Sequence, residues 1–228
     1  MVAKFIILLI LGITAAVGVK GILNGRQEAV NWKNRHTIEN QVKRAKAEGK
    51  TKLVIPGPII EYPSEGISLN EAIRDYSVLV AEPLAKQSYL VGPRDIITWY
   101  KFRTVHPLSR KTQLFCDTCP PPLEPPQEML PLGSDEFFVA VSGGTLILDG
   151  FEVTMRNSDL LALENNQRYL LFASISPSGV AQLPGGPKSI FHVNADGSLT
   201  SSKNNRMNAE LVTRFDAKLD KLKSVLKH

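Results

Sequence analysis

Two strand-forming runs, residues 145–148 and 151–155, flank the dipeptide Asp149-Gly150. Both positions of an Asp-Gly pair tolerate a positive φ angle, so this pattern is typical of a two-residue β-hairpin. Further runs rich in β-branched and aromatic residues predict buried or half-buried strands at residues 77–81, 95–105, 136–141, 168–175 and 190–193. The chain is therefore expected to be mainly β.

Helices are expected on both sides of these strands. Residues 24–50 are polar and lysine-rich, and their thin apolar stripe predicts a helical stalk or a loosely docked arm that ends at Gly49. Residues 204–228 predict one amphipathic helix, because apolar side chains recur every three or four positions at Met207, Leu211, Phe215, Leu219, Leu222 and Leu226. Its apolar stripe could dock on the β body or on a partner.

Local signals add one short helix and three turns. Ser68 and Glu71 have the spacing of a capping box, which predicts a helix starting at Leu69. Glycine pairs predict bends or turns in the segments 142–144 and 184–187, and Asn194-Ala-Asp-Gly197 predicts a turn after the strand 190–193.

The amino terminus carries an apolar run, residues 5–19, behind Lys4. Its length matches the core of a signal peptide, about 7–15 residues, and residues 16–18 are small enough for cleavage. The alternative is an uncleaved membrane anchor over residues 5–23. The positive-inside rule argues for a cytoplasmic body, because more basic residues follow the run than precede it. We nevertheless expect export to the periplasm, the cell envelope or the medium.

Charge is divided unequally along the chain, whose net charge is +5. Residues 20–52 hold nine basic and three acidic side chains, whereas residues 53–202 hold ten basic and sixteen acidic ones. Nucleic-acid-binding domains carry their basic stripe on the folded body, so no nucleic-acid partner is expected. The mix of aromatic and basic residues at 99–103 is accordingly interpreted as a strand with its aromatic side chains in the core.

Cys116 and Cys119 lie within a proline-rich segment, residues 107–133, that is expected to be an extended loop. The two thiols could form a local disulfide, remain inert, or act as a redox pair. Three prolines follow Cys119 at once and disfavour the helix that a redox thiol needs. A zinc site would need four ligands, and the chain has no second pair of this kind, so His106 and His192 would have to converge on the two cysteines.

No motif of an enzyme is present. The sequence lacks the patterns of serine hydrolases, zinc peptidases and P-loop proteins, and its carboxylates are spread singly. His192 stands between Phe191 and Val193 and is expected to be a satisfied strand residue. No catalytic residue, cofactor or metal ligand is predicted.

Four stretches carry a family resemblance: residues 68–90 with the following strand 95–105, then residues 140–150, 165–172 and 185–197. Their motifs resemble those of uncharacterised exported bacterial β-domain proteins. More distantly, they resemble the oligonucleotide/oligosaccharide-binding (OB)-like barrels of the netrin and metalloproteinase-inhibitor type. The resemblance implies a small antiparallel OB-like barrel or sandwich. The amino-terminal cysteine with which those inhibitors chelate zinc is absent, so inhibition by that route is not implied.

These observations predict four parts: a signal peptide or anchor (1–23), a polar helical stalk (24–50), a β-barrel-like domain with the loop 107–133 (51–203) and an amphipathic helix (204–228). The expected function is that of a non-enzymatic extracytoplasmic module acting through protein or envelope contacts. Its surfaces would be the proline-rich loop and the carboxy-terminal helix, with the membrane as a further partner through residues 5–23 if the leader is uncleaved. The alternative is a thiol redox or metal-binding protein that uses Cys116 and Cys119.

Overall fold

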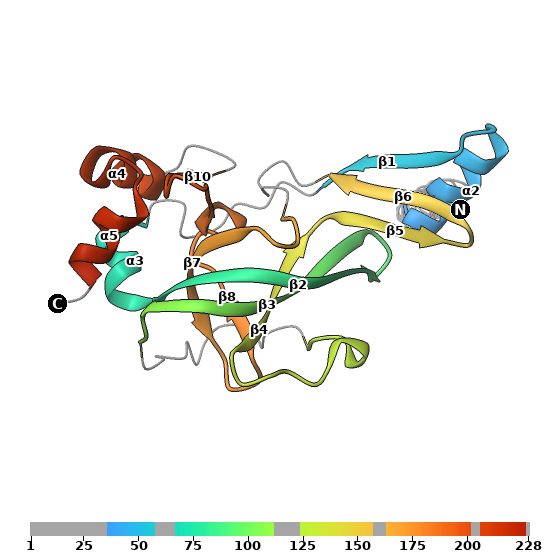
Figure 1. Cartoon of the computed structure of the whole chain (residues 1–228). Coiled ribbons are helices and arrows are strands. Elements are labelled where there is room, and N and C mark those ends of the chain that lie inside the picture. Colours follow the sequence, from blue (N-terminus) through green and yellow to red (C-terminus); the bar gives the residue numbers. More distant parts are fainter. Residues whose placement is uncertain (1–35, 58–66, 112–123, 157–162, 202–205, 227–228) are drawn as a thin grey trace, which may run out of the picture.

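The structure is a computed structural model, and it describes residues 36–57, 67–111, 124–156, 163–201 and 206–226. Its described part is mainly β, with a seven-stranded sheet, a three-stranded sheet and helices at both ends (Figure 1). None of the helices in these ranges is long and apolar enough to cross a membrane. The apolar run at residues 5–23 lies outside the described residues, so the signal or anchor remains a prediction.

The large sheet has the strand order β10-β9-β7-β2-β3-β4-β8. Strand β8 also pairs with β7, so β7, β2, β3, β4 and β8 form a closed cycle of pairings. Within this cycle only the β4–β8 pair is parallel. The strands are β2 (Ser77–Val91), β3 (Asp95–Ser109), β4 (Glu136–Ser142), β7 (Arg168–Ile175), β8 (Val180–Gln182), β9 (Ile190–Val193) and β10 (Leu199–Ser201).

All five strands of the cycle contribute to one core. This cluster includes Leu79, Phe102, Val139, Leu171 and Ala181, one from each strand. Burying such side chains away from water is the main favourable term that holds the cycle together.

A small lobe stands beside the cycle. It contains the sheet β1-β6-β5, made of β1 (Lys52–Pro56), β6 (Phe151–Arg156) and β5 (Gly144–Leu148), and helix α2 (Ile38–Ala47). Ile38, Val42 and Ala45 of α2 are buried against this sheet and against Ile96 at the tip of the β2–β3 hairpin. The prediction of a loosely docked stalk is therefore wrong for residues 38–47. Their apolar stripe is narrow, but the sheet that it faces has only three short strands, and this surface is sufficient to bury the stripe.

The chain passes from the large sheet to the small lobe at Gly143 and Gly144, whose φ angles are +94° and +135°. The Gly143 amide donates to the carbonyl of Ile96 (2.7 Å), and the Thr98 hydroxyl donates to the carbonyl of Gly143 (2.6 Å). The bend predicted here is confirmed, and its role is to move the strand from one sheet to the other.

The other local signals are also confirmed. Asp149 and Gly150 form the β5–β6 turn with φ angles of +49° and +72°. Ser68 and Glu71 form a capping box at helix α3 (Leu69–Asp75). The turn at residues 194–197 and the glycine turn at 184–187 both occur, and the second leads into the short 3-10 helix η2 (Gly186–Ser189).

The single carboxy-terminal helix was a wrong prediction. Two helices, α4 (Arg206–Phe215) and α5 (Leu219–Leu226), are separated by residues 216–218, of which Asp216 and Ala217 have positive φ angles of 50° and 48°. The break is held by the β9–β10 hairpin: the Leu199 amide of β10 donates to the carbonyl of Ala217 (2.7 Å), and the Leu219 amide donates to the carbonyl of Gly197 in the turn (3.0 Å). These bonds replace the helical ones that would join α4 to α5.

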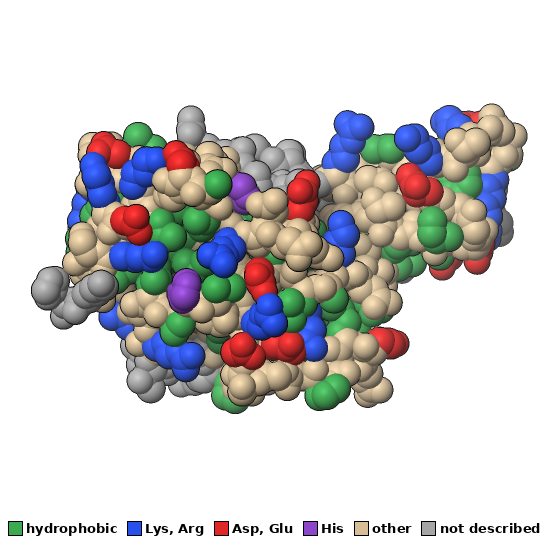
Figure 2. All heavy atoms as spheres, in the orientation of Figure 1, with side chains coloured by type: hydrophobic (Ala, Val, Ile, Leu, Met, Phe, Trp, Pro, Cys, Tyr) green, Lys and Arg blue, Asp and Glu red, His purple; other side chains and the backbone are tan. Residues whose placement is uncertain are grey.

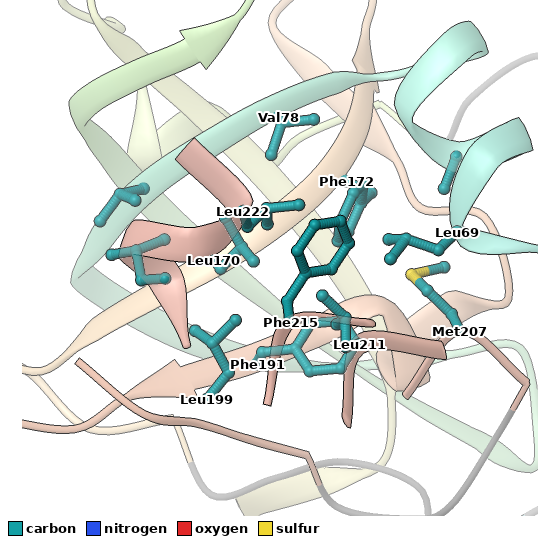
Figure 3. Close-up of a cluster of buried hydrophobic side chains, with 13 residues drawn as sticks. Leu69, Val78, Leu170, Phe172, Phe191, Leu199, Met207, Leu211, Phe215 and Leu222 are labelled. Atoms are coloured by element: carbon teal, nitrogen blue, oxygen red, sulfur yellow. The ribbon is translucent and has the colours of Figure 1, made fainter. Parts of the chain in front are cut away.

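The apolar stripe of α4 and α5 packs on the chain itself. Its side chains meet those of α3 and of strands β2, β7, β9 and β10, with Phe215 at the centre of the cluster (Figure 3). The stripe was expected to dock either on the β body or on a partner, and it docks on the β body.

The proline-rich segment departs from the predicted loop at both of its ends. Strand β3 continues through Pro107 to Ser109, and Gln127–Met129 form the 3-10 helix η1. Beyond Arg103, β3 no longer pairs with β4, so it is an edge there and tolerates a residue without an N–H group. Residues 112–123 lie outside the described part.

Candidate functional site

A polar hollow of about 210 Å³ opens at the end of the cycle where β2 and β4 begin and β7 ends. Its apolar lining comes from Leu79, Phe137 and Ile175. The remaining lining residues are polar or charged: Ser77, Thr104, Arg110, Lys111, Ser134, Asp135 and Glu136. The hollow thus combines hydroxyl groups, cations and carboxylates around a small apolar patch.

Backbone hydrogen bonds hold the walls of the hollow. The Ser77 hydroxyl accepts from the Lys111 amide (3.1 Å), which ties the end of β3 to the start of β2. The Thr104 amide donates to the carbonyl of Asp135 (2.8 Å), which fixes the segment before β4. Both contacts position side chains that lie far apart in the sequence.

The carboxylate of Glu136 is engaged in contacts with two neighbouring groups. One of its carboxylate oxygens accepts from the Gly133 amide (2.7 Å) and from the Lys101 ammonium group (2.8 Å). The hydrogen bond from Gly133 and then the one from Lys101 lower the pKa of Glu136. Glu136 is therefore a carboxylate at neutral pH, and it acts as a brace between β3 and the segment before β4.

A second pair flanks the first on the same strand. Arg103 of β3 pairs with Glu82 of β2, and this contact raises the pKa of Arg103. Lys101 additionally donates to the carbonyl of Pro131 (2.9 Å). These charged side chains connect structural segments to each other, whereas Arg110, Lys111 and Asp135 lie exposed around the hollow.

The two cysteines predicted as a disulfide or redox pair, Cys116 and Cys119, lie outside the described residues. The chain leaves the described part at Lys111, on the rim of the hollow, and returns at Glu124. The thiol hypotheses therefore remain predictions, and the hollow is the described surface from which their segment departs.

The two histidines considered as zinc ligands, His106 and His192, lie on separate strands. His192 engages Asn194 through Nδ1 (2.8 Å) and Gln167 through Nε2 (3.0 Å), which confirms the prediction of a satisfied strand residue. His106 lies on β3, three strands from β9 along the sheet, a separation on the order of 14 Å. Among the described residues, no group of three or more metal-binding side chains comes together.

The aromatic side chains at 99–103 lie in the core, as predicted. Trp99 is 3% exposed and packs edge-on against Phe138, and Met129 of η1 belongs to the same buried cluster. The basic residues of this stretch, Lys101 and Arg103, pair with Glu136 and Glu82. This strand therefore presents no stack of exposed rings to a ligand.

The hollow was not predicted from the sequence. Its lining comes from four separate stretches, residues 77–79, 104–111, 134–137 and 175. The one sequence signal in these stretches is the start of the proline-rich segment at residue 107. It predicts the end of a strand, and it does not indicate a binding or catalytic group.

Comparisons of this chain with protein-family models, curated proteins and solved structures find no match.

Proposed function

We propose that this protein is a non-enzymatic binding module of the extracytoplasmic face of a membrane, built on an OB-like barrel. In chain order the strands of the cycle are β2, β3, β4, β7 and β8, and the cycle joins them as first, second, third, fifth and fourth. A five-stranded barrel with this kind of crossed connection is the pattern of OB-like domains. The apolar leader at residues 5–23 supports the location.

The surface that OB-like domains commonly use is covered here by the chain itself. In that fold, ligands contact the second and third strands, the loop between the first two strands and the loop between the fourth and fifth. Helix η1 and its neighbour Leu132 pack over Trp99 of β3 and Phe138 of β4, and the tip of the β2–β3 hairpin packs against α2. These contacts argue against an oligonucleotide or a sugar chain as the ligand.

The hollow supports binding of a polar peptide segment of another protein. Its exposed cations Arg110 and Lys111, its hydroxyls and the exposed Asp135 surround an apolar patch, a mixture that suits backbone amides and charged side chains. The observation that carries the proposal is that Glu136, in the lining of the hollow, is engaged by the Gly133 amide and the Lys101 ammonium group. This carboxylate thus braces the site and is not arranged for proton transfer.

A photo-crosslinking side chain at Ser134 tests this function in intact cells. We expect it to capture a protein of the extracytoplasmic compartment, and we expect capture to be lost when Arg110 and Lys111 are both changed to glutamate. The matched charge reversal of Lys221 and Lys223, on α5, should leave capture unchanged. Equal capture by both variants would contradict a role of the hollow.

The location is tested separately with a carboxy-terminal reporter enzyme that is active only outside the cytoplasm. Activity of the fusion is the expected result. An inactive reporter with a full-length fusion would place the body in the cytoplasm, as the positive-inside rule favours.

The second candidate function is thiol redox or metal chemistry at Cys116 and Cys119. It is favoured by one observation, the departure of their segment from the rim of the hollow at Lys111. Alkylation and mass spectrometry with and without reductant distinguish the cases. Two free thiols with a pKa well below the ordinary value of about 8.5 would support this candidate, and a stable disulfide would support the binding module.

A further inference from the structure

Helix α2 and the residues after it form a basic surface. Residues 36–52 contain five lysine and arginine residues and two glutamates. Because the apolar side of α2 is buried in the small lobe, its charged side chains are directed outward, and Lys43, Lys46 and Lys50 are exposed. Lysine and arginine side chains are visible around this end of the molecule in Figure 2.

The positive charges of this surface differ in how far they are compensated. Lys46 donates to the neutral carbonyl of Asp149 (2.9 Å) and lies over the ring of Phe151, and neither of these contacts brings a negative charge to it. Lys50 pairs with Glu48 at 2.6 Å and is partly neutralised. The basic surface therefore depends chiefly on Lys43, Lys46 and the neighbouring Lys52, which are all exposed.

The chain connects this surface closely to the apolar run. Residues 24–35 separate the two, and twelve residues span at most about 40 Å. The small lobe lies at the opposite end of the molecule from α4 and α5 (Figure 1). If residues 5–23 are in a bilayer, α2 is the described element that is held nearest to it along the chain.

We infer that the outward face of α2 binds the anionic headgroups of the bilayer that holds the leader. The inference rests on the anchored form of the proposed function. Ile38, Val42 and Ala45 are occupied by the small sheet, so α2 cannot insert its apolar side, and the contact is electrostatic. A bilayer is favoured over a nucleic acid because this basic surface follows the apolar run within twelve residues, whereas the sequence from residue 67 to residue 201 is acidic in balance.

The full-length chain in lipid nanodiscs tests the inference. One set of discs contains phosphatidylcholine alone, and the other also contains phosphatidylglycerol. Acetylation by a water-soluble reagent, read by mass spectrometry, reports the accessibility of each lysine. We expect Lys43 to react roughly fivefold more slowly in the anionic discs, the effect of one basic residue near an anionic surface. Lys221 and Lys223 of α5 should react equally in both, and added salt should remove the difference.

A charge-reversal pair provides the matched control. Lys43→Glu with Lys46→Glu should abolish the lipid-dependent protection of Lys52, and Lys221→Glu with Lys223→Glu should preserve it. Equal labelling of Lys43 in both discs, with the chain retained by both, would overturn this inference and leave the module and its anchor in place. A chain retained by neither disc would overturn the anchor and the inference together. Protection by an added oligonucleotide in zwitterionic discs, without protection by anionic lipid, would assign the surface to nucleic acid and overturn the inference.

Discussion

Gly144 occupies a position that no other residue can fill without displacement. A Cβ atom there would lie 1.9 Å from the Thr98 hydroxyl oxygen and 2.6 Å from that of Ser88, and the φ angle is +135°. We predict that Gly144→Ala lowers the free energy of unfolding by about 2–4 kcal/mol, since it adds backbone strain and overpacking. Denaturant unfolding of the purified protein measures the loss.

Gly150 provides the control for this prediction. Its φ angle is also positive, +72°, but nothing lies within 4 Å of a Cβ atom built on it. Gly150→Ala should therefore cost only about 1 kcal/mol, the penalty of the left-handed conformation. Equal losses for the two variants would show that crowding at the sheet-switching bend is unimportant.

Glu136 makes the stability of the protein depend on pH. Its folded pKa is lowered below the ordinary value of 4.5, so its contribution is complete above that value and is lost as the pH falls through the lowered pKa. We predict that Glu136→Gln destabilises the protein by about 1 kcal/mol at pH 7. The difference from the wild type should shrink when unfolding is measured at successively lower pH below 4.5.

Glu152→Gln is the comparison for this acid effect, because Glu152 is exposed on the small sheet. It should not change the unfolding free energy at pH 7 measurably. A gap between wild type and Glu136→Gln that stays constant with pH would mean that the contacts of Glu136 with Gly133 and Lys101 do not favour its charged form.

At the scale of elements, α4 is held by a few large side chains. Phe215 is 6% exposed and belongs to the cluster shared by α3, the carboxy-terminal helices and the large sheet (Figure 3). We predict that Phe215→Ala costs about 3–5 kcal/mol and opens α4 and α5 to limited proteolysis. Val212→Ala should cost less than about 0.5 kcal/mol, because Val212 is 52% exposed on the same helix.

Elements specified by neighbouring residues could be predicted from the sequence, whereas those specified by remote contacts could not. The Asp149-Gly150 hairpin and the Ser68 capping box need only residues a few positions apart, and both are confirmed. The break between α4 and α5 depends on the turn at Gly197, whose carbonyl accepts from the Leu219 amide (3.0 Å). The apolar stripe in the sequence is continuous across the break, so it does not indicate this contact.

Strand β2 and the hollow illustrate the same limit. β2 continues ten residues beyond the predicted end at Ala81, through Glu82, Pro83 and several polar residues, because pairing with β3 supports it. The hollow requires four stretches of chain to meet, so no local pattern could indicate it. The mainly β class, by contrast, follows from the strand-forming runs alone.

On the scale of the whole molecule, the small lobe has fewer sources of stability than the strand cycle. Its core consists of one short helix, three short strands and the hairpin tip. We predict that hydrogen exchange is faster in residues 38–47 and 151–156 than in residues 168–173 at the centre of the large sheet. Mass spectrometry of the exchanged peptides measures the order.

The tip of the β2–β3 hairpin extends this prediction to residues outside the small sheet. Ile96 packs in the core of the small lobe, and the Pro93 carbonyl accepts from the Ile38 amide (2.9 Å). Residues 90–96 should therefore exchange together with the lobe, although they belong to the strands β2 and β3. Exchange at the rate of the large sheet would mean that α2 does not stabilise the tip.

The packing of α4 and α5 has a consequence for biogenesis. Leu211, Phe215 and Leu222 follow every strand in the order of synthesis, yet they cover apolar side chains of β7 and β9. When the chain emerges from a ribosome or a translocation channel with its amino terminus first, these apolar side chains of β7 and β9 remain exposed to water until α4 and α5 have emerged. A nascent chain halted before residue 206 would expose Phe172 and Phe191, and it would need a chaperone to remain unaggregated.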